Sequence, residues 1–135
     1  MSKLCAILTL LVLATTAYAD YPIQPSQVPT QNVQFIKQHF KQEITFAKKD
    51  FWEIEVYLTD GTKVEFKNGN FHSAKGFNLP VSFLPSGVQK TIKEKYSNQS
   101  LTEIEAEYYG YELEFNGMLK VKISSTGSVL YQEID

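Results

Sequence analysis

The chain has 135 residues, which is enough for one domain or for two very small ones. Its 13 basic residues are all lysines, against 15 acidic residues, and this balance argues against nucleic-acid binding, which favours a basic stripe rich in arginine. A single cysteine and two histidines exclude an internal disulfide and argue against a zinc site, while 43% apolar residues can build a packed core.

The first 19 residues have the three-part layout of a secretory signal peptide. Met1–Lys3 is a short basic start, Leu4–Thr16 is an apolar run, and Ala17–Ala19 is a small-x-small cleavage signal. The apolar run is shorter than the roughly 20 residues that a membrane-spanning helix needs. We therefore expect cleavage after Ala19 and export of residues 20–135 as a periplasmic or secreted protein with no membrane span.

The rest of the chain consists of two similar halves. Four segments of the first half recur in the same order in the second half, at an offset of 56 to 58 residues: 36–40 with 92–96, 54–58 with 111–115, 62–66 with 119–123 and 68–71 with 126–129. Self-similarity at a fixed period is the mark of a repeat architecture. We expect repeats at 20–76 and 77–135, packed as one body.

Each half is predicted to open with a short helix. Pro29 and Pro85 are each followed by a hydroxyl residue, Thr30 or Ser86, which we expect to cap the helix N-terminus. The apolar residues of each helix recur on one face: Val33, Ile36 and Phe40 in the first, and Val88, Ile92 and Tyr96 in the second. Helices this short need a sheet to pack against.

A hairpin follows the first helix, because apolar and polar residues alternate over 53–58 and again over 63–66. A two-residue turn would set inward Leu58 opposite outward Lys63. A three-residue turn at 59–61 instead pairs Val56 with Val64, and its glycine suits the left-handed conformation needed there. We expect the three-residue turn.

The second half is predicted to repeat this hairpin across 116–118, with Leu113 opposite Val121 and Tyr111 opposite Ile123. Further strands are expected near 44–49, 71–75, 101–107 and 129–134. Alternating strands need one covered face, which the helices supply. The predicted fold is therefore α+β, a tandem repeat of a helix plus antiparallel strands that form one sheet with both helices on one face. The apolar connection 77–85 should pack onto this body.

The whole pattern resembles the PepSY-like family of periplasmic proteins, also described as β-lactamase-inhibitor-like. The resemblance rests on the two hydrophobic-Pro pairs, the two Ile-Lys-x-x-aromatic helices, the two hairpins and the glycine turns after them, and it covers nearly all of the chain after residue 19. It implies that the sheet is curved, with the helices on its convex side and a concave face that binds a partner protein. "Inhibitor-like" describes a shape here, and inhibition of a β-lactamase is not transferred.

The sequence contains no catalytic constellation. Nucleophilic catalysis needs a nucleophile held by a base, which is usually histidine, and we expect structural roles for His39 and His72. Cys5 leaves with the signal peptide, and no phosphate loop or metal-spaced cluster is present. We expect no enzyme activity, no cofactor and no metal centre.

Outward residues of the strands are the first candidate for a site. In the second half they include five carboxylates, Glu103, Glu105, Glu107, Glu112 and Glu114, and like charges facing one another across strands cost stability. Lys122 opposite Glu112 and Lys120 opposite Glu114 should offset this cost. The corresponding outward residues of the first half are Phe46, Lys48, Asp50, Glu55, Tyr57 and Lys63.

The two halves also differ in charge. Residues 20–76 hold seven acidic residues and seven lysines, whereas residues 77–135 hold eight and five, a net charge of −3. Three interpretations of the acidic face stay open: an ordinary solvated surface, a docking face for a basic partner, and a weak Ca²⁺ site.

Aromatic pairs are the second candidate. Phe51-Trp52 and Tyr108-Tyr109 occupy equivalent positions before the two main hairpins. Parity places Trp52 and Tyr109 inward, where we expect them to join the core. Phe51 and Tyr108 fall in connections at one edge, where exposed aromatic residues beside charges are typical of interface anchors.

These patterns predict an exported, non-enzymatic binding module that binds a protein or peptide on the open sheet face. The alternative is a small-molecule or Ca²⁺-binding periplasmic protein. Apolar contacts are assigned to Tyr57, Phe51 and Tyr108. The charged contacts that align the partner are assigned to Lys48, Lys63, Glu105, Glu112, Glu114, Lys120 and Lys122.

Overall fold

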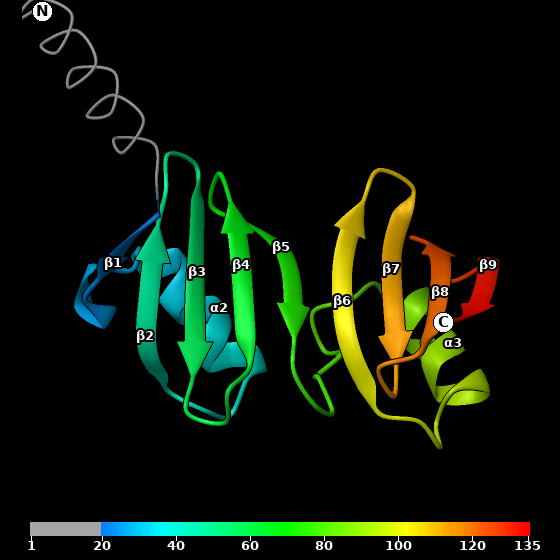
Figure 1. Cartoon of the computed structure of the whole chain (residues 1–135). Coiled ribbons are helices and arrows are strands. Elements are labelled where there is room, and N and C mark those ends of the chain that lie inside the picture. The colour runs from blue at the N-terminus through cyan, green and yellow to red at the C-terminus, as the bar shows by residue number, and fades with distance from the viewer. Residues whose placement is uncertain (1–19) are drawn as a thin grey trace, which may run out of the picture.

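A computed structural model describes residues 20–135, and the predicted signal peptide lies outside the described residues. Nine strands form one sheet in which every neighbouring pair is antiparallel and the spatial order follows the chain from β1 to β9 (Figure 1). The strands are β1 Tyr21–Ile23, β2 Ile44–Lys49, β3 Glu53–Leu58, β4 Lys63–Lys67, β5 Asn70–Lys75, β6 Leu101–Glu107, β7 Gly110–Phe115, β8 Leu119–Ser124 and β9 Val129–Ile134.

The helices lie in the connections at corresponding places. A short 3₁₀ turn, η1 Pro25–Gln27, and the helix α2 Thr30–His39 lie between β1 and β2, and the helix α3 Ser86–Lys95 lies between β5 and β6. Within residues 20–135, no helix is long and apolar enough to cross a membrane.

A line of apolar side chains crosses the sheet from strand to strand and forms the centre of the core. The register joins seven buried residues in order, one from each strand between β2 and β8: Ala47, Val56, Val64, Ala74, Ile104, Leu113 and Val121. We call these residues the apolar row. Ile36 of α2 and Val88 of α3 belong to the same core cluster. The sheet therefore needs both helices to remove this row from water.

Both main hairpins form as predicted, with Val56 opposite Val64 and Leu113 opposite Val121. In the first hairpin the Leu58 amide donates to the Thr62 carbonyl at 2.8 Å, and Gly61 has a φ of 88°. The left-handed glycine lets the three-residue turn close without a steric penalty.

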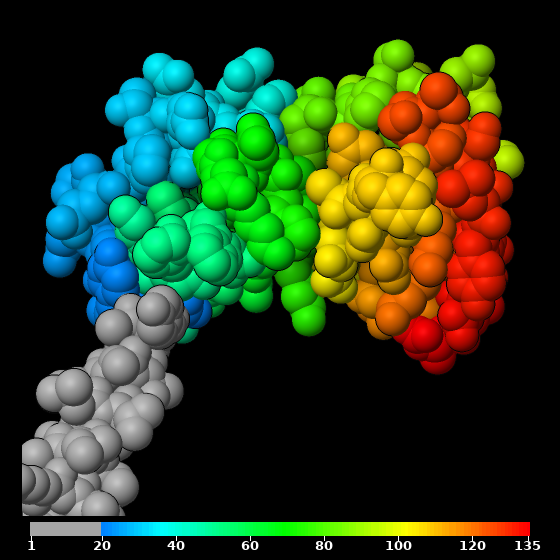
Figure 2. Space-filling view, turned by 90° about the horizontal axis from the view of Figure 1, so that it is seen from above, coloured from blue at the N-terminus to red at the C-terminus, as the bar shows by residue number. Residues whose placement is uncertain are grey.

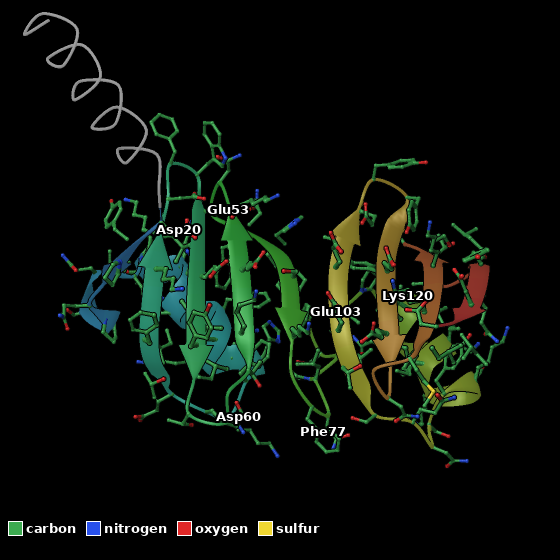
Figure 3. All side chains as sticks on the ribbon, viewed as in Figure 1. Asp20, Glu53, Asp60, Phe77, Glu103 and Lys120 are labelled. Carbon is green, nitrogen blue, oxygen red and sulfur yellow. The ribbon has the colours of Figure 1, made fainter. Side chains whose placement is uncertain are left out.

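The connection between the halves packs down, as its apolar residues predict. Leu79 and Leu84 are buried, and the ring of Phe83 lies 4.6 Å from that of Phe71 on β5 and 5.1 Å from that of Phe35 on α2. Phe77, at the lower end of β5 in Figure 3, is the exception and stays exposed.

The predicted hydroxyl caps are wrong. Thr30 and Ser86 are the first residues inside their helices, Pro29 and Pro85 occupy the cap positions, and neither helix has a side-chain cap. The helices begin one residue earlier than predicted because each proline carbonyl already accepts a helical bond, from Val33 at 3.1 Å and from Gln89 at 3.0 Å.

Strand β1 was not predicted. Three residues are too few to show an alternation, and Pro22 at its centre disfavours a strand unless the strand lies at an edge. Its Ile23 pairs with Ala47 and extends the apolar row by one position.

The first turn of α3 touches the backbone of the β8–β9 turn. A Cβ added at Gly87 would clash with the Thr126 carbonyl oxygen, and the Thr91 hydroxyl donates to the Gly127 carbonyl at 2.6 Å. The absence of a side chain at Gly87 therefore lets the helix approach the sheet.

We predict that Gly87→Ala destabilises the protein by about 1–3 kcal/mol, because the added methyl group overpacks this contact. In an unobstructed helix the same change would stabilise by up to about 1 kcal/mol. Urea denaturation measures the difference. Lys90→Ala, at an exposed position of α3, is the control and should change stability by no more than about 0.5 kcal/mol. A stabilised Gly87→Ala variant would contradict the predicted clash.

Candidate functional site

The outward side chains of the strands form two rows that cross the sheet on either side of the apolar row. We call the surface that they make the open face. The first row is Phe46, Tyr57, Lys63, Lys75, Glu103, Glu114, Lys120 and Glu133. The second row is Lys48, Glu55, Glu65, Ser73, Glu105, Glu112, Lys122 and Tyr131. Eight of the ten predicted site residues lie in these rows, and Phe51 and Tyr108 do not.

Four carboxylates meet where β6 pairs with β7. Glu103 lies opposite Glu114, and Glu105 lies opposite Glu112. A shallow hollow of about 130 Å³ lies among them and is also lined by Lys120. We call these four residues the acidic square. Figure 3 marks its place by Glu103 on β6 and by Lys120 on β8.

The two lysines predicted to offset this charge have other partners. The register is as predicted, with Lys120 opposite Glu114 and Lys122 opposite Glu112. However, Lys120 Nζ lies 3.3 Å from Asp135 Oδ2, and Lys122 Nζ lies 5.6 Å from the ring centre of Tyr131. No ion pair within residues 20–135 reaches the acidic square. Its four carboxylates therefore lack a salt-bridged lysine among the described residues, although Lys75 lies opposite Glu103 in the register.

Sequence reasoning missed Asp135 because it follows the last strand and belongs to no alternation. Its position comes from the backbone, since the Asp135 amide donates to the Met118 carbonyl at 2.9 Å and holds the residue beside the start of β8. The Asp135 carboxylate then raises the pKa of Lys120 through a hydrogen bond and through its charge.

Glu103 shows the electrostatic cost of the square. Burial raises the pKa of its carboxyl group above the ordinary value of 4.5, and the charge of Glu114 raises it further, against a smaller opposing effect of Lys75. Two members of the square, Glu105 and Glu112, also form a trio with Glu107, in which carboxylate oxygens lie within 4.8 Å of one another. A cation at this place would relieve the repulsion.

On the same surface of the first half, the repulsion between opposed carboxylates is compensated by nearby contacts. Glu55 lies opposite Glu65, but Lys63 Nζ lies 3.1 Å from Glu65 Oε1, and the Ser73 hydroxyl donates to Glu65 at 3.1 Å. Burial acts to raise the pKa of Glu65, yet these two contacts outweigh it and lower the pKa. Burial raises the pKa of Glu55, partly against a hydrogen bond from Tyr57. The two halves therefore differ in charge pairing as well as in net charge.

An aromatic and cationic group lies at the β2–β3 end of the open face. The rings of Phe46 and Tyr57 are 5.7 Å apart, and Lys48 Nζ lies 5.8 Å from the Tyr57 ring centre and 6.0 Å from that of Phe46. The Tyr57 hydroxyl donates to Glu55 at 3.0 Å. Of the three predicted aromatic contacts, only Tyr57 lies on the open face.

Phe51 and Tyr108 lie in the turns β2–β3 and β6–β7, at the same end of the strands. They are 74% and 99% exposed. Figure 2 looks onto this end of the strands, with both turns facing the viewer. The structure thus separates these two aromatic residues from the rows that hold the other eight predicted residues.

The prediction that Trp52 joins the core is wrong, since its side chain is 61% exposed. Asp50 Oδ1 accepts the amides of Trp52 at 3.1 Å and Glu53 at 2.7 Å, and this side-chain turn takes Trp52 out of the strand alternation. Tyr109 is half-buried, and its buried hydroxyl has no hydrogen-bond partner within residues 20–135.

We predict that Glu103→Gln stabilises the protein at pH 7 by about 0.2–1 kcal/mol, because it removes a like-charge pair between strands. A raised pKa means that folded Glu103 holds its proton more tightly than the unfolded residue, so the contribution of Glu103 to wild-type stability rises as pH falls through this pKa. The gain from Glu103→Gln should therefore vanish below the ordinary carboxyl range. Denaturant titrations across pH measure it.

Glu53→Gln is the matched control for this measurement. Glu53 lies 3.2 Å from Lys67 Nζ, so neutralising it removes an attraction and should give no gain at pH 7. Equal effects of the two substitutions would show that the acidic square carries no repulsion.

Known proteins share this architecture. The sequence model described as putative beta-lactamase-inhibitor-like, PepSY-like matches residues 52–131. A putative calcium-regulated periplasmic protein from Bacteroides thetaiotaomicron is 31% identical, with a TM-score of 0.73 over 84% of this chain and 96% of that chain. A putative periplasmic protein of unknown function from Bacteroides vulgatus is 26% identical, with a TM-score of 0.73 over 85% of this chain and 99% of that chain.

Curated protein sequences give no match. The family model nevertheless covers more than half of the chain, and the first of these solved structures aligns over most of both chains. The chain therefore belongs to the PepSY-like family.

Proposed function

We propose that this protein is an exported, non-enzymatic binding module, built from tandem repeats at 20–76 and 77–135 with both helices on one face. Figure 1, in which α2 and α3 both lie behind the strands, supports this arrangement. So does a shared contact: Gln31 of α2 donates to the Gly69 carbonyl of the β4–β5 turn, as Thr91 of α3 donates to Gly127 of the β8–β9 turn. The periplasmic descriptions of similar structures support export.

The proposed binding surface is the open face, and the proposed partner is a protein or peptide that presents a basic side chain to the acidic square. One observation carries this proposal: four carboxylates oppose one another across β6 and β7, while Lys120 and Lys122 of the neighbouring strand β8 contact Asp135 and Tyr131. Repulsion inside the free protein is a cost that a bound cation removes. Binding therefore gains from the relief of strain as well as from direct attraction.

The other end of the open face has a complementary role. Tyr57 offers an apolar surface, and Lys48 and Lys63 place positive charge beside it. A partner with basic and acidic residues in the right order would bind in only one direction. Phe51 and Tyr108 would contact only a partner that extends past the ends of the strands and over these two turns.

We predict that the double variant Glu105→Gln, Glu112→Gln loses at least tenfold in affinity for the partner, because it removes two of the four charges that attract its cation. The partner is captured from a native envelope extract on immobilised protein and identified by mass spectrometry. Affinity is then measured for the purified pair, where wild-type binding should weaken with added salt.

A matched control neutralises two exposed glutamates outside the open face, Glu43→Gln and Glu94→Gln. The control carries the same net charge as the test variant and should bind like the wild type. If both double variants bind equally, the open face is not the binding surface.

Calcium binding is the second candidate function. The B. thetaiotaomicron protein is described as calcium-regulated, and two carboxylate trios in this chain bring their oxygens within 4.8 Å. Glu53 and Glu65 of the first trio are already paired with lysines. The second trio, Glu105, Glu107 and Glu112, has no such ion pair within residues 20–135 and is the better candidate.

We predict for this candidate that Ca²⁺ raises the melting temperature progressively once its concentration exceeds the Kd, by an amount equivalent to about 2.7 kcal/mol at 100 times the Kd. Glu112→Gln should abolish the shift, whereas Glu65→Gln should preserve it. Mg²⁺ should give a smaller shift because it demands a stricter octahedral geometry. The absence of a Ca²⁺-dependent shift in the wild type would reject calcium binding and leave the protein-binding proposal standing.

A further inference from the structure

A cavity lies at the start of α2, away from the open face. Its volume is about 280 Å³, and its walls are the first turn of α2 and the turns β2–β3 and β4–β5, which lie at the same end of the strands in Figure 1. Buried Phe66 lines it, and so do the exposed residues Phe51 and Trp52, whose rings are 4.8 Å apart. None of its lining residues belongs to the two rows of the open face. This cavity is therefore a separate candidate for a ligand site.

Asn32 brings an unpaired hydrogen-bond donor to the cavity. It is one of the lining residues, it is 1% exposed, and its Nδ2 has no hydrogen-bond partner among the residues that the structure describes. A buried donor without a partner costs stability. Packing does not require a polar residue at this place in the helix, because the third residue of α3 is the fully buried Val88 where the third residue of α2 is Asn32. The Asn32 amide therefore indicates a ligand.

The cavity stays open because α2 does not close onto its neighbouring turn as α3 does. At the second position of α3, Gly87 lies so close to the Thr126 backbone that a Cβ would not fit. At the second position of α2, the side chain of Gln31 reaches the Gly69 carbonyl of the β4–β5 turn at 3.4 Å. A glutamine side chain between helix and turn leaves space that the glycine contact removes.

Hydrogen-bond donors and positive charge prevail at this cavity. Helix α2 begins here, and within residues 20–135 no side chain caps its first amides, which carry partial positive charge. Lys49 adds a full positive charge to the lining. The two acidic lining residues already have partners. Asp50 Oδ1 accepts the amides of Trp52 and Glu53, and the Glu53 carboxylate lies 3.2 Å from Lys67 Nζ. The ligand that fits is therefore a hydrogen-bond acceptor.

We propose that this cavity binds a small organic acid that carries one carboxylate and an apolar or aromatic body. The carboxylate accepts a hydrogen bond from Asn32 and lies near the start of α2 and Lys49, since a helix N-terminus favours an anion. The apolar body covers the exposed rings of Phe51 and Trp52. One negative charge fits better than the two of a phosphate ester, because Asp50 also lines the cavity. Binding here is independent of the proposed binding on the open face.

The first test uses Trp52 as a reporter, because it is the only tryptophan in the chain and lines the cavity. The probe is phenylacetate, followed by tryptophan fluorescence and by titration calorimetry. We expect a saturable fluorescence change with matching heat. Phenylacetamide should bind at least about tenfold more weakly, because hydrogen bonds to a charged acceptor are stronger than those to a neutral one. Acetate, which lacks the ring, and inorganic phosphate should bind more weakly than phenylacetate.

The second test changes the donors. Asn32→Val should weaken phenylacetate binding at least about tenfold. It should leave the melting temperature unchanged or raise it, because it removes an unpaired buried group. Lys49→Gln should weaken binding about two- to fivefold, as expected for an exposed charge. Lys95→Gln makes the same charge change at an exposed position at the end of α3 and is the matched control, which should bind like the wild type.

The source of the carboxylate is read with a second probe, N-acetylglycylphenylalanine. Tighter binding than that of phenylacetate would assign the site to peptide C-termini, and weaker binding would assign it to free small acids. The absence of both fluorescence change and heat with either probe would overturn the proposal. So would equal binding of phenylacetate and phenylacetamide, or unchanged affinity in Asn32→Val. A lower melting temperature of Asn32→Val with unchanged affinity would show that Asn32 has a structural role instead.

Discussion

The apolar row is the constraint on which the rest of the structure depends. Seven buried residues, one from each strand between β2 and β8, lie side by side and connect the two halves without a break. Ala74 of β5 meets Ile104 of β6 at the junction of the two halves, so the core continues from the first half into the second. Both helices contribute to the same cluster. The two halves therefore share one core and one sheet.

The chemistry of the open face follows from this row. Because side chains alternate along a strand, burial of Ile104 and Leu113 sends their neighbours on both sides to the opposite surface. Those neighbours are the four members of the acidic square, which the register sets directly opposite one another. A slip of one residue would bury these charges, so hydrophobic burial holds them in place despite their repulsion. The repulsion is thus sustained by the core on the other side of the same strands.

Much of this arrangement is visible in the sequence, because alternation with period two specifies which residues share a face. The two hairpins, the opposition of Glu112 to Lys122 and the buried connection all follow from that period. The partners of long side chains cannot be predicted from that period. Lys120 contacts Asp135, which no strand pattern includes, and Trp52 leaves its predicted side because Asp50 builds a local turn. Three-residue β1 is too short for any periodicity to appear.

The uninterrupted sheet also sets the distance between the two ends of the open face. Tyr57 on β3 and Glu103 on β6 belong to the same row and are separated by three strand-to-strand steps. At about 4.8 Å per step, the aromatic end and the nearest member of the acidic square are about 14 Å apart along the sheet. An extended chain covers that span with about four residues. Under the proposed function, a ligand shorter than this would contact one end of the open face or the other but not both, so the width of the sheet would set the shortest ligand that binds in a defined direction.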